Sequence, residues 1–250
     1  MRRLLFAGVL ALLLAVSPAL WAQLTDGPPM PAALDLHKAP VGSWAEYKIG
    51  IAALPTMTTR MALVARAKNL VTLEMTVDGG VLAAAGGKMT LQTTVDADTS
   101  KAGAVKKLVM QMGPNDPMEM PPETAQHKQF EKPDPKSFVN DEMVTVAGGT
   151  FKAKHYRQKT AKGDPLEFWI SGDVPPFGLV KIQGQQTMGP PGGTAAPAAI
   201  SFELQSHGKS AASVITTPVK PFDQQVFMGQ MTNTAKAMSS AAAAKTPPAK

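Results

Sequence analysis

Strict two-residue alternation is the feature that most constrains the fold of this chain. Between Val71 and Asp78, apolar side chains alternate with Thr, Glu and Asp, so one face is apolar and the other polar. This period is that of a half-buried β-strand and not of a helix. Further strand-like segments follow along the chain, at residues 45–51, 57–63, 89–95, 108–112, 142–146, 150–158, 166–171, 179–186 and 199–206.

These segments are mostly separated by short turns, without repeated alternation of strands and helices. Neighbouring strands are therefore expected to pair antiparallel, with one face buried and one wet. Because a flat sheet of this size would leave long edges, it should curve. The chain also has 21 Gly and 22 Pro, and only 6% aromatic residues, which favours many turns. We predict a mainly β fold: a curved antiparallel sheet or open half-barrel of about ten strands with one or two short helices.

The N-terminus has the pattern of a cleaved signal peptide. Arg2 and Arg3 precede an apolar stretch that ends near Val16, and small residues follow up to Ala22. The stretch is shorter than the roughly 20 residues that span a bilayer. We expect residues 1–22 to be removed, which indicates a bacterial protein that is periplasmic or secreted.

The remaining chain divides into three parts. Residues 23–40 form a Pro-rich segment that we interpret as a flexible leader, and residues 41–239 are expected to form a single antiparallel β domain. Within it, a Pro-rich loop is predicted at residues 113–138, with a short helix as an alternative near 123–130. A helix is predicted near Asp223–Ser239, and a disordered Ala/Pro-rich tail at 240–250.

Composition excludes several classes of function. The chain has no cysteine, so disulfides, thiolate metal sites and thiol nucleophiles are absent. Without Arg2 and Arg3, 23 basic and 19 acidic side chains leave a net charge of +4. The lysines are scattered and form no basic stripe interleaved with aromatics, so we expect no nucleic-acid partner. No segment after residue 22 approaches spanning length, so no transmembrane segment is expected in the mature chain.

The second half carries motifs that resemble a known group of proteins. The motifs are Val144–Tyr156 with its Gly148-Gly149 step, Phe168–Ser171, Val174–Lys181 and Phe202–Gly208. In this order they resemble uncharacterised secreted bacterial β-proteins, which are similar to the LolA/LolB-like lipoprotein-carrier fold. The resemblance spans roughly residues 142–208. It implies an unclosed antiparallel half-barrel with a helix-bearing lid over an apolar cavity, and a scaffold that handles lipid or another hydrophobic ligand.

Signatures of catalysis are weak. There is no G-x-S-x-G elbow, and the Gly pairs lack the lysine and helix of a phosphate loop. Carboxylate pairs such as Asp96/Asp98 and Asp141/Glu142 occupy turn or strand-edge positions typical of solvated acids. The four histidines, at 37, 127, 155 and 207, are too far apart for a local zinc motif, although His155 and His207 could meet across neighbouring strands. We expect a protein that is not an enzyme and needs no cofactor.

The leading hypothesis is an exported domain that binds a lipid or other apolar small molecule, or that interacts with an envelope protein. The predicted lining comprises Met75, Met89, Leu91, Met110, Met112, Trp169 and Phe177.

Two alternatives stay open. Met-x-Met pairs at Met110/Met112 and Met118/Met120, with His127 downstream, would suit copper(I), which soft thioethers select. That hypothesis requires at least three of these five side chains to converge. Alternatively, unbranched Met simply fills an irregular core, and the domain is a structural or interaction module.

Overall fold

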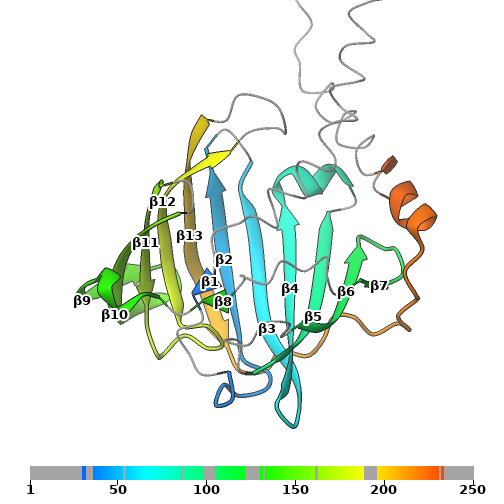
Figure 1. Cartoon of the computed structure of the whole chain (residues 1–250), viewed down its shortest axis with the longest axis horizontal. Coiled ribbons are helices and arrows are strands. Elements are labelled where there is room, and N and C mark those ends of the chain that lie inside the picture. The colour runs from blue at the N-terminus through cyan, green and yellow to red at the C-terminus, as the bar shows by residue number, and fades with distance from the viewer. Residues whose placement is uncertain are drawn as a thin grey trace, which may run out of the picture.

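The computed structural model of the chain consists mainly of one open β-sheet (Figure 1). The structure describes residues 30–31, 36–52, 55–85, 87–97, 105–121, 130–131, 133–160, 163–188, 196–230 and 232–233. Eleven strands pair antiparallel in the order β7-β6-β5-β4-β3-β2-β13-β12-β11-β10-β9. The sheet curves strongly and does not close, with β7 at one edge and β9 at the other. The predicted fold class is confirmed. The predicted signal peptide and the tail at 240–250 lie outside the described residues.

All ten strands predicted from alternation are present, with boundaries shifted by a few residues. They are β2 (Trp44–Ile51), β3 (Met57–Ala67), β4 (Leu70–Gly79), β5 (Lys88–Asp96), β6 (Val105–Met112), β9 (Phe138–Val146), β10 (Gly149–Lys159), β11 (Pro165–Ile170), β12 (Leu179–Met188) and β13 (Ala196–Gly208).

Two meanders make up the sheet. Strands β2 to β7 pair in sequence order, and so do β9 to β13, while β2 and β13 join the two meanders at the centre. Beside that junction, the buried Tyr47 hydroxyl donates to the Leu179 carbonyl at 3.1 Å. The first and second halves of the chain therefore contribute adjacent parts of one continuous sheet.

The Pro-rich segment at 113–138 contains more structure than predicted. It includes the edge strand β7 (Met118–Met120), the two-residue β8 (Phe130–Glu131) and a 3-10 turn, η3 (Pro135–Ser137). Strand β8 pairs in parallel with β1 (Met30–Pro31), so part of the predicted leader is also fixed. The alternative helix near 123–130 falls mainly on residues outside those described.

Helical structure is short. A 3-10 segment, η1 (Gly80–Ala85), connects β4 to β5. Residues 224–230 form the helix predicted in the C-terminal segment, and the Asp223 carboxylate caps it by accepting from Gln225 N–H at 2.8 Å and Val226 N–H at 3.0 Å. Within the described residues, no helix has the length and apolar character needed to cross a membrane.

Candidate ligand-binding face

Methionine dominates one face of the first meander. Directly opposed residues in neighbouring strands share a face, so the register identifies which side chains lie together. One cross-strand row runs from Met118 through Met110, Leu91 and Met75 to Met61. Within the described residues, all methionines of β3 to β7 lie on this apolar face: Met57, Met61, Met75, Met89, Met110, Met112, Met118 and Met120.

The buried apolar residues form two clusters. The first draws on strands β2 to β5 and β10 to β13, and contains Tyr47, Phe168, Phe177 and Leu204 among others. The second lies over β2–β7 and includes most of these methionines. Four apolar residues, which we call the seam, pack against both clusters and stay half-buried: Ile51, Met75, Val105 and Phe202.

Short elements cover parts of both clusters. Leu82 of η1 belongs to the methionine-rich cluster, and Phe227 of the helix at 224–230 packs against it. Leu36 and Ala39 belong to the other cluster, where Arg66 Nη2 donates to both carbonyls at 2.7 Å and 2.6 Å. The helix-bearing lid and the apolar cavity that the resemblance implies stay predictions.

A C-terminal strap, residues 209–223, crosses the opposite, polar face of the first meander. The Glu74 carboxylate anchors it by accepting from Ser213 Oγ at 2.7 Å and from Val214 N–H at 3.0 Å. Gln92 Nε2 donates to both Glu74 and Ser213. The expectation that Glu74 lies on a wet face was wrong: its exposed fraction is 5%, because the strap covers it.

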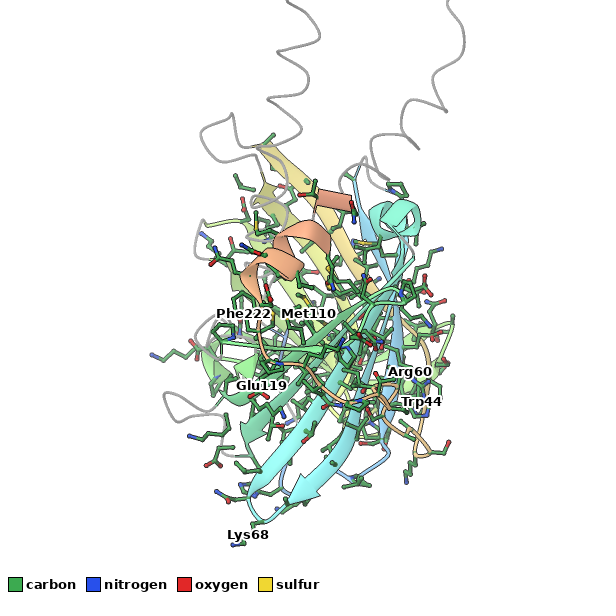
Figure 2. The ribbon with its side chains drawn as sticks, turned by 90° about the vertical axis from the view of Figure 1, so that its right-hand side faces the viewer. Trp44, Arg60, Lys68, Met110, Glu119 and Phe222 are labelled. Atoms are coloured by element: carbon green, nitrogen blue, oxygen red, sulfur yellow. The ribbon has the colours of Figure 1, made fainter. Side chains whose placement is uncertain are left out.

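The strap then passes the β7 edge. Lys220 N–H donates to the Pro117 carbonyl, the Lys220 carbonyl accepts from Glu119 N–H, and Lys220 Nζ lies 2.6 Å from Asp116 Oδ2. Figure 2 views the molecule from this side, with Met110, Glu119 and Phe222 labelled. The strap therefore connects the polar face to the helix that contacts the methionines.

Five of the seven predicted lining residues come together. Met110 lies opposite Leu91, Leu91 opposite Met75, and Met112 opposite Met89. Met89, Met110 and Met112 are buried, whereas Met75 and Leu91 are half-buried.

The other two predicted lining residues lie elsewhere. Phe177 is buried in the loop between β11 and β12, in the other cluster. Trp169 is buried in that same cluster, although its cross-strand row contains Lys181 and Glu203, on the polar face. Its ring stacks on His155 at 4.5 Å, and its Nε1–H donates to Glu142. His155 contacts Trp169 and His207 packs against Phe151, so these two histidines have separate partners.

Sequence reasoning missed Ile51, Phe202 and Phe227 as lining candidates. Ile51 and Phe202 lie on the apolar faces of strands that alternation had predicted. The same alternation could therefore have identified both as lining residues. Phe227 follows a helix cap and has no periodic partner that would indicate its packing. Of the side chains in the copper hypothesis, the register brings Met110, Met112, Met118 and Met120 onto neighbouring positions, and His127 lies outside the described residues.

Comparison with models of protein families and with curated proteins gave no match. Among solved structures, the chain is similar to the hypothetical protein CT021 from Chlamydia trachomatis, at 11% identity over 72% of this chain and 95% of that chain, with a TM-score of 0.37. It is similar to MucB at 12% identity, over 73% of this chain and 57% of that chain, with a TM-score of 0.36. A Bacteroides fragilis protein with a YmcC-like fold shows 11% identity over 68% and 97% of the respective chains, with a TM-score of 0.34. At these TM-scores the likenesses carry no argument about function.

Proposed function

We propose that this protein is an exported, non-enzymatic β domain that binds a lipid or another apolar small molecule on the apolar face of its open sheet. Export is inferred from the signal-like residues 1–22. The motifs between residues 142 and 208, which resemble the LolA/LolB-like carrier fold, support the same class of ligand.

The observation that carries the proposal is the half-buried seam between the two clusters. Ile51, Met75 and Phe202 are apolar, lie on one face of a curved sheet, and keep solvent exposure although they contact both clusters. Leu91 adds a fourth half-buried apolar side chain beside Met75. Covering such surface with an apolar ligand contributes about 25 cal/mol per Å² buried. An acyl chain has the apolar character that this floor requires.

Methionine suits such a floor. Its unbranched side chain adopts several shapes, and Met-rich surfaces accept apolar ligands of varied outline. The methionines around the seam belong to strands, which hold their backbones in register, while Phe227 packs on the same cluster from a separate short helix. We infer a sheet floor that this helix partly covers.

The first test is native mass spectrometry of the mature protein purified from its own periplasm, followed by denaturing extraction. A copurified species of lipid mass that disappears on denaturation supports the proposal and identifies the ligand. A bare protein mass calls for titration with N-phenyl-1-naphthylamine, whose fluorescence rises in apolar sites. A bare mass together with no fluorescence gain overturns the proposal.

Variants locate the site. Met75→Gln and Leu91→Gln place amides in the seam, so each should weaken binding of the probe at least several-fold. The matched control is Met143→Gln, because Met143 lies on β9 with 65% of its surface exposed and far from the seam in strand order. Equal effects at Met75 and Met143 would remove the seam as the binding site.

A further inference from the structure

The hairpin of β6 and β7 places two Met-x-Met pairs next to each other. Met110 lies directly opposite Met118, and Met112 lies two residues from Met110 on the same face. On the other side of β6, Met112 lies directly opposite Met89. Directly opposed Cβ atoms are about 4.5–5.5 Å apart, which lets these long side chains bring their sulfurs together. Three of these thioethers, those of Met110, Met112 and Met118, therefore belong to this one hairpin.

The turn between the two pairs is well fixed. Asn115 donates to the Met112 carbonyl through Nδ2 at 2.8 Å and through its backbone N–H at 3.1 Å. Gln111 Nε2 donates to the Asn115 carbonyl at 3.0 Å, and Gly113 supplies the positive φ of 54°. These bonds set the register of β7 against β6. The turn therefore helps to set Met110 opposite Met118, and the strap holds β7 from its other side through Lys220.

The sulfurs lie in a buried, polar-poor environment. Met110, Met112 and Met118 have exposed fractions of 4%, 5% and 4%. The Met118 Sδ already acts as an acceptor, because Asp223 N–H lies 3.5 Å from it. A thioether sulfur has a second lone pair that this contact does not use.

We propose that Met110, Met112 and Met118 form a binding site for one soft monovalent metal ion, copper(I). Soft, neutral thioethers select copper(I) over harder divalent ions. Within the described residues, no three His, Asp or Glu side chains gather in an arrangement that could hold a metal, so harder ions have no comparable set of ligands there. The ion binds already reduced, and no electron transfer is involved. This site does not depend on the proposed binding of an apolar ligand.

The test is anaerobic competition for copper(I) between the mature protein and bathocuproine disulfonate. Native mass spectrometry with silver(I), a redox-inert analogue, gives the stoichiometry. We expect one ion per chain and an X-ray absorption spectrum with only sulfur neighbours. No binding, a nitrogen or oxygen shell, or several ions of equal affinity would overturn the proposal.

The decisive variant replaces three thioethers by a side chain of similar volume: Met110→Leu, Met112→Leu and Met118→Leu together. Mutating a residue that only supports a metal ligand typically lowers metal affinity roughly 10–100-fold. Because this variant removes the ligands themselves, its copper(I) affinity should fall by more than that. The control carries Met57→Leu, Met61→Leu and Met143→Leu, which remove three thioethers elsewhere, and it should keep wild-type affinity. If the triple variant does not fold, the single edge variant Met118→Leu replaces it and should still weaken binding.

Met75→Gln serves as the reverse test, because it alters the seam of the apolar site and leaves all the proposed sulfur ligands in place, so it should keep wild-type copper(I) affinity. Weakened probe binding with retained copper(I) affinity in Met75→Gln separates the metal site from the proposed ligand site. Retained copper(I) in the triple variant would overturn the metal site whatever the probe does.

Discussion

The Glu74 carboxylate and the backbone N–H of Val214 are hydrogen-bonded at 3.0 Å, although 140 residues separate them in the chain. This contact fixes the strap to the polar face of β4. It turns a residue with the pattern of a wet strand face into a buried anchor. The strap in turn leads to the helix whose Phe227 packs on the methionines.

Replacing Glu74 by Gln should therefore destabilise the fold and loosen the strap. The variant keeps the shape but loses the charge, and one acceptor oxygen becomes a donor facing the Ser213 and Val214 groups. The expected cost is about 1–3 kcal/mol in free energy of unfolding, measured by urea denaturation. Hydrogen exchange at residues 213–215 should accelerate.

Glu119→Gln is the matched control for Glu74. Glu119 pairs with Lys107 at 3.1 Å, but its side chain is 48% exposed. Such surface pairs contribute about 0–1 kcal/mol. Equal losses in the two variants would show that the strap adds nothing to the stability of this face.

Much of the fold follows from the sequence because its information is local. Alternation identified ten strands, and Asp223 marked the start of the helix at 224–230. Strand β7 was missed because three residues between Pro117 and Pro121 are too few to show a period. The meeting of β2 with β13 was not predictable either, since it joins segments about 150 residues apart whose patterns fit many partners.

The candidate site was predictable to the same extent. The alternation of apolar and polar residues predicts that Met75, Leu91 and Met110 lie on the apolar faces of their strands. Because these strands are joined by consecutive hairpins, they are expected to pair with one another. Trp169 was also predicted to line the ligand site, but the register places it in a row with Lys181. The sequence of the strap has no periodic hydrophobic pattern. Neither the burial of Glu74 nor the packing of Phe227 could therefore be predicted from it.

Trp44 and Trp169 make a matched pair for a second prediction. Trp169 Nε1–H donates to Glu142, whereas the buried Trp44 Nε1–H has no hydrogen-bond partner. Trp169→Phe removes a bond to a charged group, worth about 1.5–3 kcal/mol.

Trp44→Phe weakens the contact with Arg60, whose guanidinium carbon lies 4.4 Å from the ring, and removes a buried unsatisfied donor (Figure 2). These two effects oppose each other, so we expect a change within about 1 kcal/mol. Urea unfolding of both variants measures the difference. A larger loss for Trp44→Phe than for Trp169→Phe would contradict the assigned hydrogen bonds.

Tyr47 should make the fold sensitive to alkali. Complete burial raises the pKa of Tyr47 well above its ordinary value of about 10. The unfolded chain releases this proton above about pH 10 while the folded chain keeps it, so the unfolded state gains as pH rises. The contribution of Tyr47 is full below pH 10 and falls by about 1.4 kcal/mol per pH unit above it.

Tyr47→Phe tests this sign. Near neutral pH the variant should be about 1 kcal/mol less stable, because it loses the bond to the Leu179 carbonyl. Between about pH 10 and 11.5 its stability should fall less steeply than that of the wild type, so the two curves converge near pH 11. Parallel curves across this range would refute the role of Tyr47.

Gly184 should tolerate no side chain. A Cβ there would lie 2.3 Å from the Pro165 carbonyl oxygen and 3.0 Å from the Leu166 Cα, both on the backbone of the paired strand. Gly184→Ala is expected to lower the free energy of unfolding by about 1–3 kcal/mol or more. In Gly172→Ala the added Cβ meets nothing within 4 Å, so its thermal midpoint should stay near that of the wild type.

The strand order indicates that the pairing of the eleven strands does not require an unbroken chain between β7 and β9. Each meander is a ladder of hairpins between neighbours in sequence, and β2 with β13 forms the ladder that joins them among the described strands. Between β7 and β9, the described residues contribute no strand to the eleven-stranded sheet. Two separately synthesised polypeptides, one ending at Pro121 and the other beginning at Phe130, should therefore reassemble by fragment complementation, with the strap of the second fragment clasping the first.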